Sequence, residues 1–142
     1  MFHRKSNVAK SASIGASSTL CKYGDCYDKK NMVDDDRNEE LGSRNSWVSD
    51  NRGDTWVSFS WAKGLEDLEQ VYFIGTAGYE PDQYKISVRT DRGWQIVADV
   101  AGNSELKICH RFPATKVYTV KIEGSGPSHE PLKLRLNEVV IR

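Results

Sequence analysis

The sequence predicts an all-β protein, an antiparallel β-sandwich of the jelly-roll type. Short segments of alternating apolar and polar residues recur along the chain, and turn-rich loops separate them. No segment of helical length keeps an apolar i, i+3, i+4 pattern. Several strands joined by such loops are typical of two packed antiparallel sheets. A chain of 142 residues is expected to form one domain, covering residues 1–142.

Alternation within two central segments predicts part of the core. Residues 55–61 place Val57, Phe59 and Trp61 on one face, with serines opposite. Residues 70–74 are apolar on both faces, as in a central strand. We therefore expect two separate strands here, both packed into the interior.

The next segments predict a hairpin and two further strands. Residues 83–89 form the first strand, a turn follows at residues 91–93, and residues 94–100 return from it. Residues 106–111 and 116–123 are the two strands that follow. The side chains expected to point inward are Tyr84, Ile86, Val88, Tyr118, Val120 and Ile122.

The closing segment, residues 134–142, alternates as a strand but carries the acid Glu138 between apolar neighbours. An unpaired buried carboxylate costs roughly several kcal/mol, so a cation partner is expected. An acidic cluster, Asp34 to Asp36, lies in the irregular region of residues 11–53. A Ca²⁺ ion bridging the two is our hypothesis, because calcium takes hard oxygen ligands. The alternative is a solvated acidic loop.

Composition limits the class of partner. The 20 basic and 20 acidic residues cancel, which argues against nucleic acid as the main partner. No apolar run approaches eighteen residues, so no transmembrane helix is expected. The first seven residues are basic but have no apolar segment behind them, so they are not an intact signal peptide.

Cysteine positions indicate the compartment. Cys21 and Cys26 bracket a tight polar loop that a disulfide could close, with a metal or redox pair as the alternative. A disulfide favours an oxidising compartment, so we expect a periplasmic or secreted protein. Cys109 falls inside a predicted strand and is expected to be a buried, inert thiol.

Several segments, taken in order, resemble one known superfamily. They are NVAKSAS from residue 7, MVDDD from residue 32, SWVS from residue 46, WVSF from residue 56 and LNEVVI from residue 136. Their order and spacing are similar to the galactose-binding-like sandwich of the discoidin and coagulation-factor type C superfamily, and closest to family 32 carbohydrate-binding modules. The resemblance implies a jelly-roll sandwich that binds sugar without catalysis.

The resemblance also implies a structural Ca²⁺ site near the two chain ends. Asp34 matches the side-chain aspartate of the family and Glu138 its glutamate in the closing strand. Asp36 and Asn45 lie where the remaining loop ligands would fall, some of them through backbone carbonyls. Trp47 and Trp56 match framework positions and are expected in the core.

In this superfamily the sugar sites lie on loops at one end of the sandwich. Here those loops would be residues 17–31, 49–54, 76–82 and 124–133. Val48 stands where galactose-binding members place a histidine, and residues 75–82 contain neither arginine nor asparagine. The usual contacts to neutral galactose therefore do not carry over.

The loops instead contain cationic and aromatic side chains, which suit an acidic sugar polymer such as polygalacturonate, a pectic chain. Lysine and arginine pair with carboxylates, and aromatic faces stack on sugar rings. The alternative is that the loop lysines serve only solubility. The candidate ligand-binding residues are Lys22, Tyr23, Lys29, Lys30, Arg44, Arg52, Tyr79, His129 and Lys133.

Other functions are less well supported by the residues. A discoidin-like adhesion or protein-interaction domain and a binder of neutral galactosides are the alternatives. The loop tips lack paired bulky apolar residues, which argues against membrane insertion. No nucleophile–base motif is present, so we do not expect an enzyme. We expect the protein to be a monomer. The RGD tripeptide at residues 52–54 is read as chance, and His110 as a structural residue.

Overall fold

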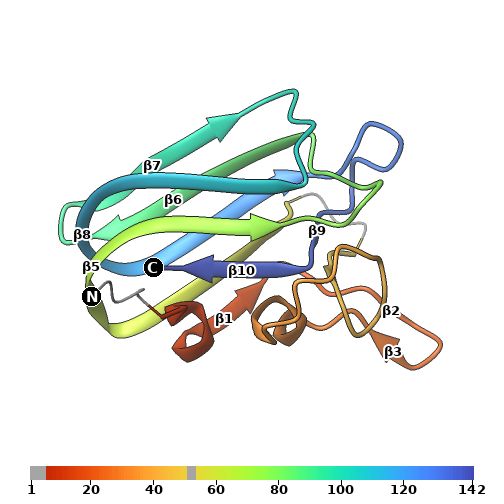
Figure 1. Cartoon of the computed structure of the whole chain (residues 1–142), viewed down its shortest axis with the longest axis horizontal. Helices are drawn as coiled ribbons and strands as arrows, with labels where there is room; N and C mark the ends of the chain where they lie inside the picture. The colour runs from red at the N-terminus through yellow and green to blue at the C-terminus, as the bar shows by residue number, and fades with distance from the viewer. Residues whose placement is uncertain (1–5, 51–53) are drawn as a thin grey trace, which may run out of the picture.

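Two antiparallel layers of strands face each other in the computed structural model, which describes residues 6–50 and 54–142 (Figure 1). The strands are paired in the order β1–β5–β8–β6–β7, and β10 pairs with β5. Two long strands, β5 (Trp56–Ile74) and β8 (Lys107–Ser125), take part in both layers because each one bends and returns. The predicted antiparallel sandwich is confirmed.

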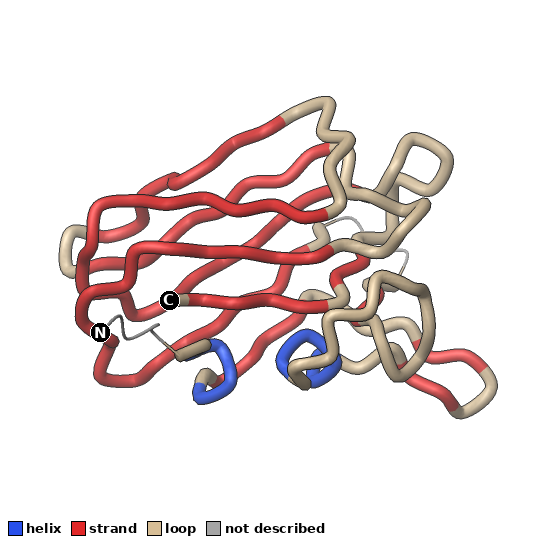
Figure 2. Tube along the Cα trace, in the orientation of Figure 1, coloured by secondary structure: helices blue, strands red, loops and turns tan. Residues whose placement is uncertain are grey.

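The other elements are short apart from one hairpin. Two small sheets, β2–β3 and β4–β9, lie at one end, and most of the loops gather there (tan in Figure 2). The bends of β5 and β8 lie at the opposite end. The remaining bounds are η1 Val8–Ser11, β1 Ser13–Ala16, β2 Cys21–Lys22, β3 Asp25–Cys26, η2 Lys29–Val33, β4 Trp47–Val48, β6 Gln83–Thr90, β7 Gly93–Val100, β9 Arg135–Leu136 and β10 Glu138–Ile141.

The bends correct the prediction of separate strands. Segments 55–61 and 70–74 are the two halves of β5, and its partner β8 likewise spans both segments predicted after the hairpin. Register shifts between Ser60 and Gln70 keep the strands paired through the bend. The polar residues at the bend are typical of a loop in the sequence, but in the structure they belong to β5 and remain irregularly paired with β8.

The predicted core is largely confirmed. Val57, Phe59 and Trp61 are buried, as are the three inward side chains of β6. Tyr118 is a correction, because it is only half-buried: its hydroxyl donates to Asp91 Oδ1 at 2.7 Å. The irregular stretch of the β5–β8 ladder buries Val117 instead.

Two further predictions about single residues need correction. Cys109 is exposed, because it alternates with the buried Ile108 and therefore points outward from β8. Trp47 is fully buried as predicted, whereas Trp56 is half-buried on the outer face, with Lys121 Nζ 5.4 Å from its ring centroid.

Three further findings concern a histidine, a disulfide and the helices. His110 Nε2 and the Tyr84 hydroxyl form a hydrogen bond of 2.7 Å, which is a structural contact. Cys21 and Cys26 form a disulfide. Among the helices of the described residues, none has the length and apolar character needed to cross a membrane.

Candidate functional site

Glu138 is the least satisfied charged group described in the interior. It opens β10, opposite Ile74 of β5, and its residue is 1% exposed. Neither carboxylate oxygen has a hydrogen-bond partner. Burial, followed by the negative charges of Asp34 and Asp35, raises the pKa of Glu138 to about 8.

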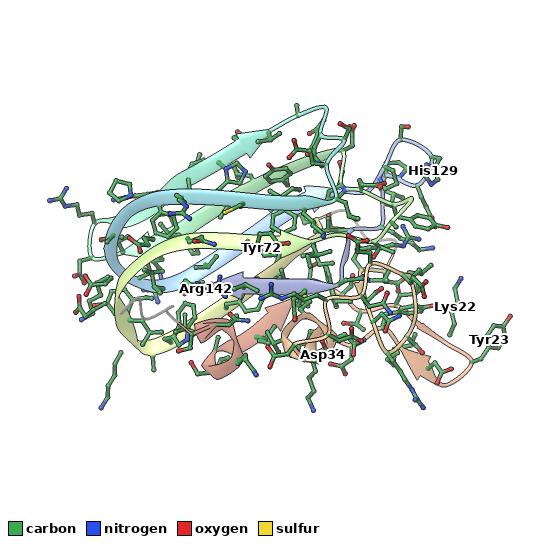
Figure 3. All side chains as sticks on the ribbon, in the orientation of Figure 1. Lys22, Tyr23, Asp34, Tyr72, His129 and Arg142 are labelled. Carbon is green, nitrogen blue, oxygen red and sulfur yellow. A yellow bond between two sulfur atoms is a disulfide. The ribbon has the colours of Figure 1, made fainter. Side chains whose placement is uncertain are left out.

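The acidic loop lies next to this carboxylate. It follows η2, which packs against β10. Asp34 Oδ1 accepts a hydrogen bond from the backbone N–H of Asp36 at 2.9 Å, and Asp35 pairs with Lys10. Figure 3 shows Asp34 on the same side of the sandwich as η2.

The predicted ligands do not form a closed set of side chains. In residues 6–50 and 54–142, no three acidic, histidine or cysteine side chains are arranged to hold a metal ion. Asp36 Oδ1 accepts from the Asn38 N–H at 3.1 Å, and the Asn45 N–H donates to Gly42 O at 3.0 Å. A cation here would draw one buried carboxylate from β10 and take other oxygens from the loop backbone, which calcium accepts.

Asn137, the neighbour of Glu138, ties the surrounding loops together. It is fully buried, and its Oδ1 accepts from Ser46 Oγ at 2.6 Å and Thr76 Oγ1 at 2.7 Å. Its Nδ2 donates to Asn38 O at 2.7 Å and Glu40 O at 2.8 Å. The side chain thus uses both of its amide hydrogens and both acceptor sites of its oxygen.

A second unusual group, Arg135, lies two residues earlier on β9. It is 5% exposed, and its guanidinium carbon lies 4.1 Å from the ring centroid of Tyr79. Its Nη2 donates to Glu130 Oε2 at 2.8 Å, whereas Nε and Nη1 have no partner. A buried arginine with two unused donor groups is an exception to the usual satisfaction of buried polar atoms.

Glu130 connects this arginine to a second cation. Its Oε1 accepts from Lys133 Nζ at 3.2 Å. Partial burial raises the pKa of Glu130, but the hydrogen bonds from Arg135 and Lys133 outweigh that effect and lower it below the ordinary value. Glu130 therefore stays ionised and fixes the positions of both cations.

These groups line a small pocket of about 80 Å³ at the loop end of the sandwich. Its lining combines apolar and charged side chains, with more basic than acidic ones among them. Tyr79 lies beside it against Arg135, and the ring of His129 is 5.5 Å from that of Tyr79. The lining residues are Leu20, Lys22, Tyr27, Leu41, Val48, Glu130, Lys133 and Arg135.

The structure brings together only part of the predicted set. Lys22, Tyr79, His129 and Lys133 gather around the pocket. Lys29 instead lines a separate shallow hollow beside the disulfide.

The other predicted residues lie elsewhere on the chain. Lys30 and Arg44 are exposed and line neither hollow. Tyr23 is fully exposed at the tip of the β2–β3 hairpin (Figure 3), and Arg52 lies outside the described residues.

Arg135, Glu130 and Tyr27 are site residues that the sequence prediction missed. Arg135 lies between two apolar residues in the closing segment, so it carries the same signal as Glu138, a charge at a strand position. That signal was available from the pattern. Glu130 and Tyr27 lie in loops, where a charged or aromatic side chain is ordinary and no pattern separates them from their neighbours.

Comparison with known proteins supplies the fold relationship. No family model and no curated protein sequence matches the chain. A chitosan-binding module from a chitosanase/glucanase of Paenibacillus sp. IK-5 has a similar structure, with a TM-score of 0.75, 19% identity and coverage of 96% of this chain and 98% of that one. A fucose-binding module from Streptococcus pneumoniae superposes with a TM-score of 0.74 at 18% identity, covering 97% and 98% of the two chains.

A third solved structure is the CBM32 of AlyQ in complex with 4,5-unsaturated mannuronic acid. Its TM-score is 0.65 at 17% identity, and the match covers 92% of this chain and 93% of that one. This chain has the fold of carbohydrate-binding modules. The resemblance found in the sequence is thereby confirmed at the level of fold, and the three similar structures are described as carbohydrate-binding modules.

Proposed function

We propose that this protein is a non-catalytic carbohydrate-binding module whose ligand binds at the pocket beside Tyr79 and Arg135. The buried guanidinium of Arg135 carries the proposal, because Arg135 lines the pocket and its Nε and Nη1 have no hydrogen-bond partner. An unsatisfied buried donor costs about 1–3 kcal/mol. A ligand that accepts those hydrogen bonds relieves that cost, and sugars present oxygens in dense arrays.

Tyr79 adds the second element of a sugar site. Aromatic rings bind the apolar face of a sugar by burying its C–H groups. Tyr79 is held in place by Arg135 on its ring and by a turn in which its N–H donates to Thr76 O at 2.9 Å. A rigid ring next to unpaired donors is the combination that orients a polar ligand with an apolar face.

We further propose that the preferred ligand is an acidic polysaccharide of the galacturonate type. Three cations, Lys22, Lys133 and Arg135, surround the pocket against one acid, Glu130. The AlyQ module, which shares the fold, was solved with an acidic sugar. A carboxylate on the ligand would pair with the excess positive charge.

A neutral sugar is the second candidate, and Glu130 favours it. Its carboxylate already neutralises part of Arg135 and Lys133, and it can accept hydrogen bonds from sugar hydroxyls. The Streptococcus pneumoniae module with the same fold is described as fucose-binding.

A structural Ca²⁺ ion at Glu138 is part of the proposal. The orphaned carboxylate of Glu138 beside Asp34 suits a hard divalent cation, with Asp36 and Asn45 contributing carbonyl oxygens from the loop. When bound, the ion would neutralise the buried acid and link the closing strand to the acidic loop. The disulfide between Cys21 and Cys26 supports the periplasm or the cell exterior as the compartment.

Affinity electrophoresis tests the sugar assignment. Polygalacturonate, alginate and a neutral galactan are cast in gels at low and high salt. Retardation in the acidic polymers that weakens with salt is expected, because salt screens exposed charges. Retardation in the galactan alone would favour the neutral candidate, and retardation in no gel would overturn the proposal.

Arg135→Gln is expected to weaken binding to the retarding polymer by about tenfold or more, since it removes the charge and the fork of donors. Isothermal titration calorimetry with that polymer measures the change. Arg89→Gln is the matched control, because Arg89 also stacks on a tyrosine, 5.1 Å from the Tyr118 centroid, but on β6. Equal affinity in the Arg135 variant and the wild type would remove Arg135 from the site.

A further inference from the structure

The β2–β3 hairpin presents an aromatic side chain that nothing in the fold uses. Tyr23 is fully exposed, and no side chain from Cys21 to Cys26 is buried. Figure 3 shows Tyr23 projecting away from the body of the molecule, at the same end as His129 and Lys22. The hairpin tip therefore contributes almost no packing to the stability of the sandwich.

The backbone at this tip makes tyrosine an unfavourable choice. Tyr23 has a φ of 53° and Gly24 a φ of 84°, the left-handed pair of a two-residue hairpin turn. Asparagine, aspartate and glycine adopt that conformation readily, whereas a bulky aromatic residue is strained there by about 1–2 kcal/mol. Strain together with full exposure indicates that the ring serves something other than folding.

The hairpin is nevertheless held firmly. The disulfide joins Cys21 and Cys26 directly across the two strands, with Lys22 opposite Asp25. An isolated two-stranded hairpin is marginally stable at best, so the covalent link maintains the geometry of the tip.

The base of the hairpin belongs to the pocket. The Leu20 N–H donates to Val48 O at 2.8 Å, and the Tyr27 N–H donates to Leu20 O at 3.0 Å. Val48 lies opposite Arg135 in the β4–β9 pair. Lys22 lines the pocket, and Tyr23 is the next residue toward the tip.

We infer that the hairpin is a second aromatic subsite, and that the ligand is a chain of several sugar residues extending from the pocket to Tyr23. This inference rests on the proposed sugar-binding function. One sugar ring lies at the mouth of the pocket, against Arg135 and Tyr79, and a later ring of the same chain stacks on Tyr23. The disulfide keeps the tip in position, so the affinity for a chain depends on it whereas the affinity for a single sugar does not.

The test compares single sugars with chains. Galacturonic acid, polygalacturonate, galactose and a neutral galactan are titrated into the wild-type protein and into Tyr23→Ala. The variant is expected to bind the preferred polymer about three- to tenfold more weakly and its monomer unchanged. Tyr23→Phe is expected to retain the polymer affinity, because it keeps the ring. Trp94→Ala is the matched control, an exposed aromatic residue on β7 that lines none of the pocket, and it is expected to change nothing.

The disulfide is tested by the double variant Cys21→Ser/Cys26→Ser. It is expected to lose polymer affinity by a similar factor and to keep monomer affinity, and adding Tyr23→Ala to it is expected to change little more. Unchanged polymer affinity in Tyr23→Ala, with binding still lost in Arg135→Gln, would overturn this inference and leave the proposed function standing. Failure of all four sugars to bind the wild type would overturn both.

Discussion

In the presence of a calcium chelator, the free energy of unfolding is expected to fall as the pH rises from 4.5 to about 8. The lower limit is the ordinary pKa of a glutamate and the upper limit is the pKa of Glu138 in the folded protein. The folded state holds the Glu138 proton over that interval while the unfolded state has lost it. Because the native state binds more protons, its stability decreases with rising pH. A loss of about 2–4 kcal/mol across the interval is the expected size, with little further change from this group above pH 8.

Urea unfolding across this pH range, with chelator and with added Ca²⁺, measures the effect. Calcium is expected to restore stability most at high pH, where the carboxylate is ionised and can bind it. Glu138→Gln removes the titrating group and should flatten the curve in chelator. Glu130→Gln is the matched control, since the pKa of Glu130 is lowered and its stabilisation is lost only as the pH falls. If the stability of Glu138→Gln falls with pH as steeply as that of the wild type, the pH dependence comes from other groups.

Asn137→Ala is expected to cost about 3–4 kcal/mol, the largest loss from any single polar side chain described here. The substitution leaves the hydroxyls of Ser46 and Thr76 and the carbonyls of Asn38 and Glu40 without their partner. The main cost comes from the hydroxyls of Ser46 and Thr76, which lie in fully buried residues and would each pay a desolvation penalty when left unpaired. Since 1 kcal/mol shifts the midpoint of a protein of this size by about 2–4 °C, Tm should fall by about 10 °C.

Differential scanning calorimetry measures this change, and Asn103→Ala is its control. Asn103 donates through Nδ2 to Pro81 O at 2.8 Å and Glu105 O at 3.0 Å, but it is only half-buried in a surface loop. Water can replace those bonds, so a loss below about 1 kcal/mol is expected. Equal losses in the two variants would mean that burial of the Asn137 network adds no more stability than the half-buried hydrogen bonds of Asn103.

The parts of the fold that the sequence predicted are those set by local alternation. Phe59 and Ile86 follow strictly alternating segments, so their burial follows from the two-residue period of a strand. Glu138 could be predicted as an unusual residue because an acid at a position that the alternation places among apolar residues is unexpected. The continuity of β5 could not be predicted, because pairing with β8 holds its polar bend in a strand and the partner lies far along the chain.

The candidate site was predicted less well, because it depends on which loops converge. The sequence marks Lys22 and Lys29 alike as loop cations, but the hairpin separates them into different hollows. The pattern marks Arg135 only as a charge at a strand position; its place in the site follows from two unpaired donor groups and from Tyr79 lying against its guanidinium. Convergence of side chains from distant loops is a tertiary property that no local pattern encodes.

The position of Arg142 has a practical consequence for presenting this protein on a surface. Its N–H donates to Gln70 O at 3.0 Å, and its carbonyl accepts from the Gln70 N–H at 2.8 Å. Figure 3 places Arg142 toward the bends of β5 and β8, away from the hairpin that carries Tyr23. A tether attached at Arg142 would therefore start from a hydrogen-bonded part of the backbone, and the loop end of the sandwich would point away from the surface. On a biosensor surface, immobilisation through this residue would thus keep the pocket accessible to long polymers.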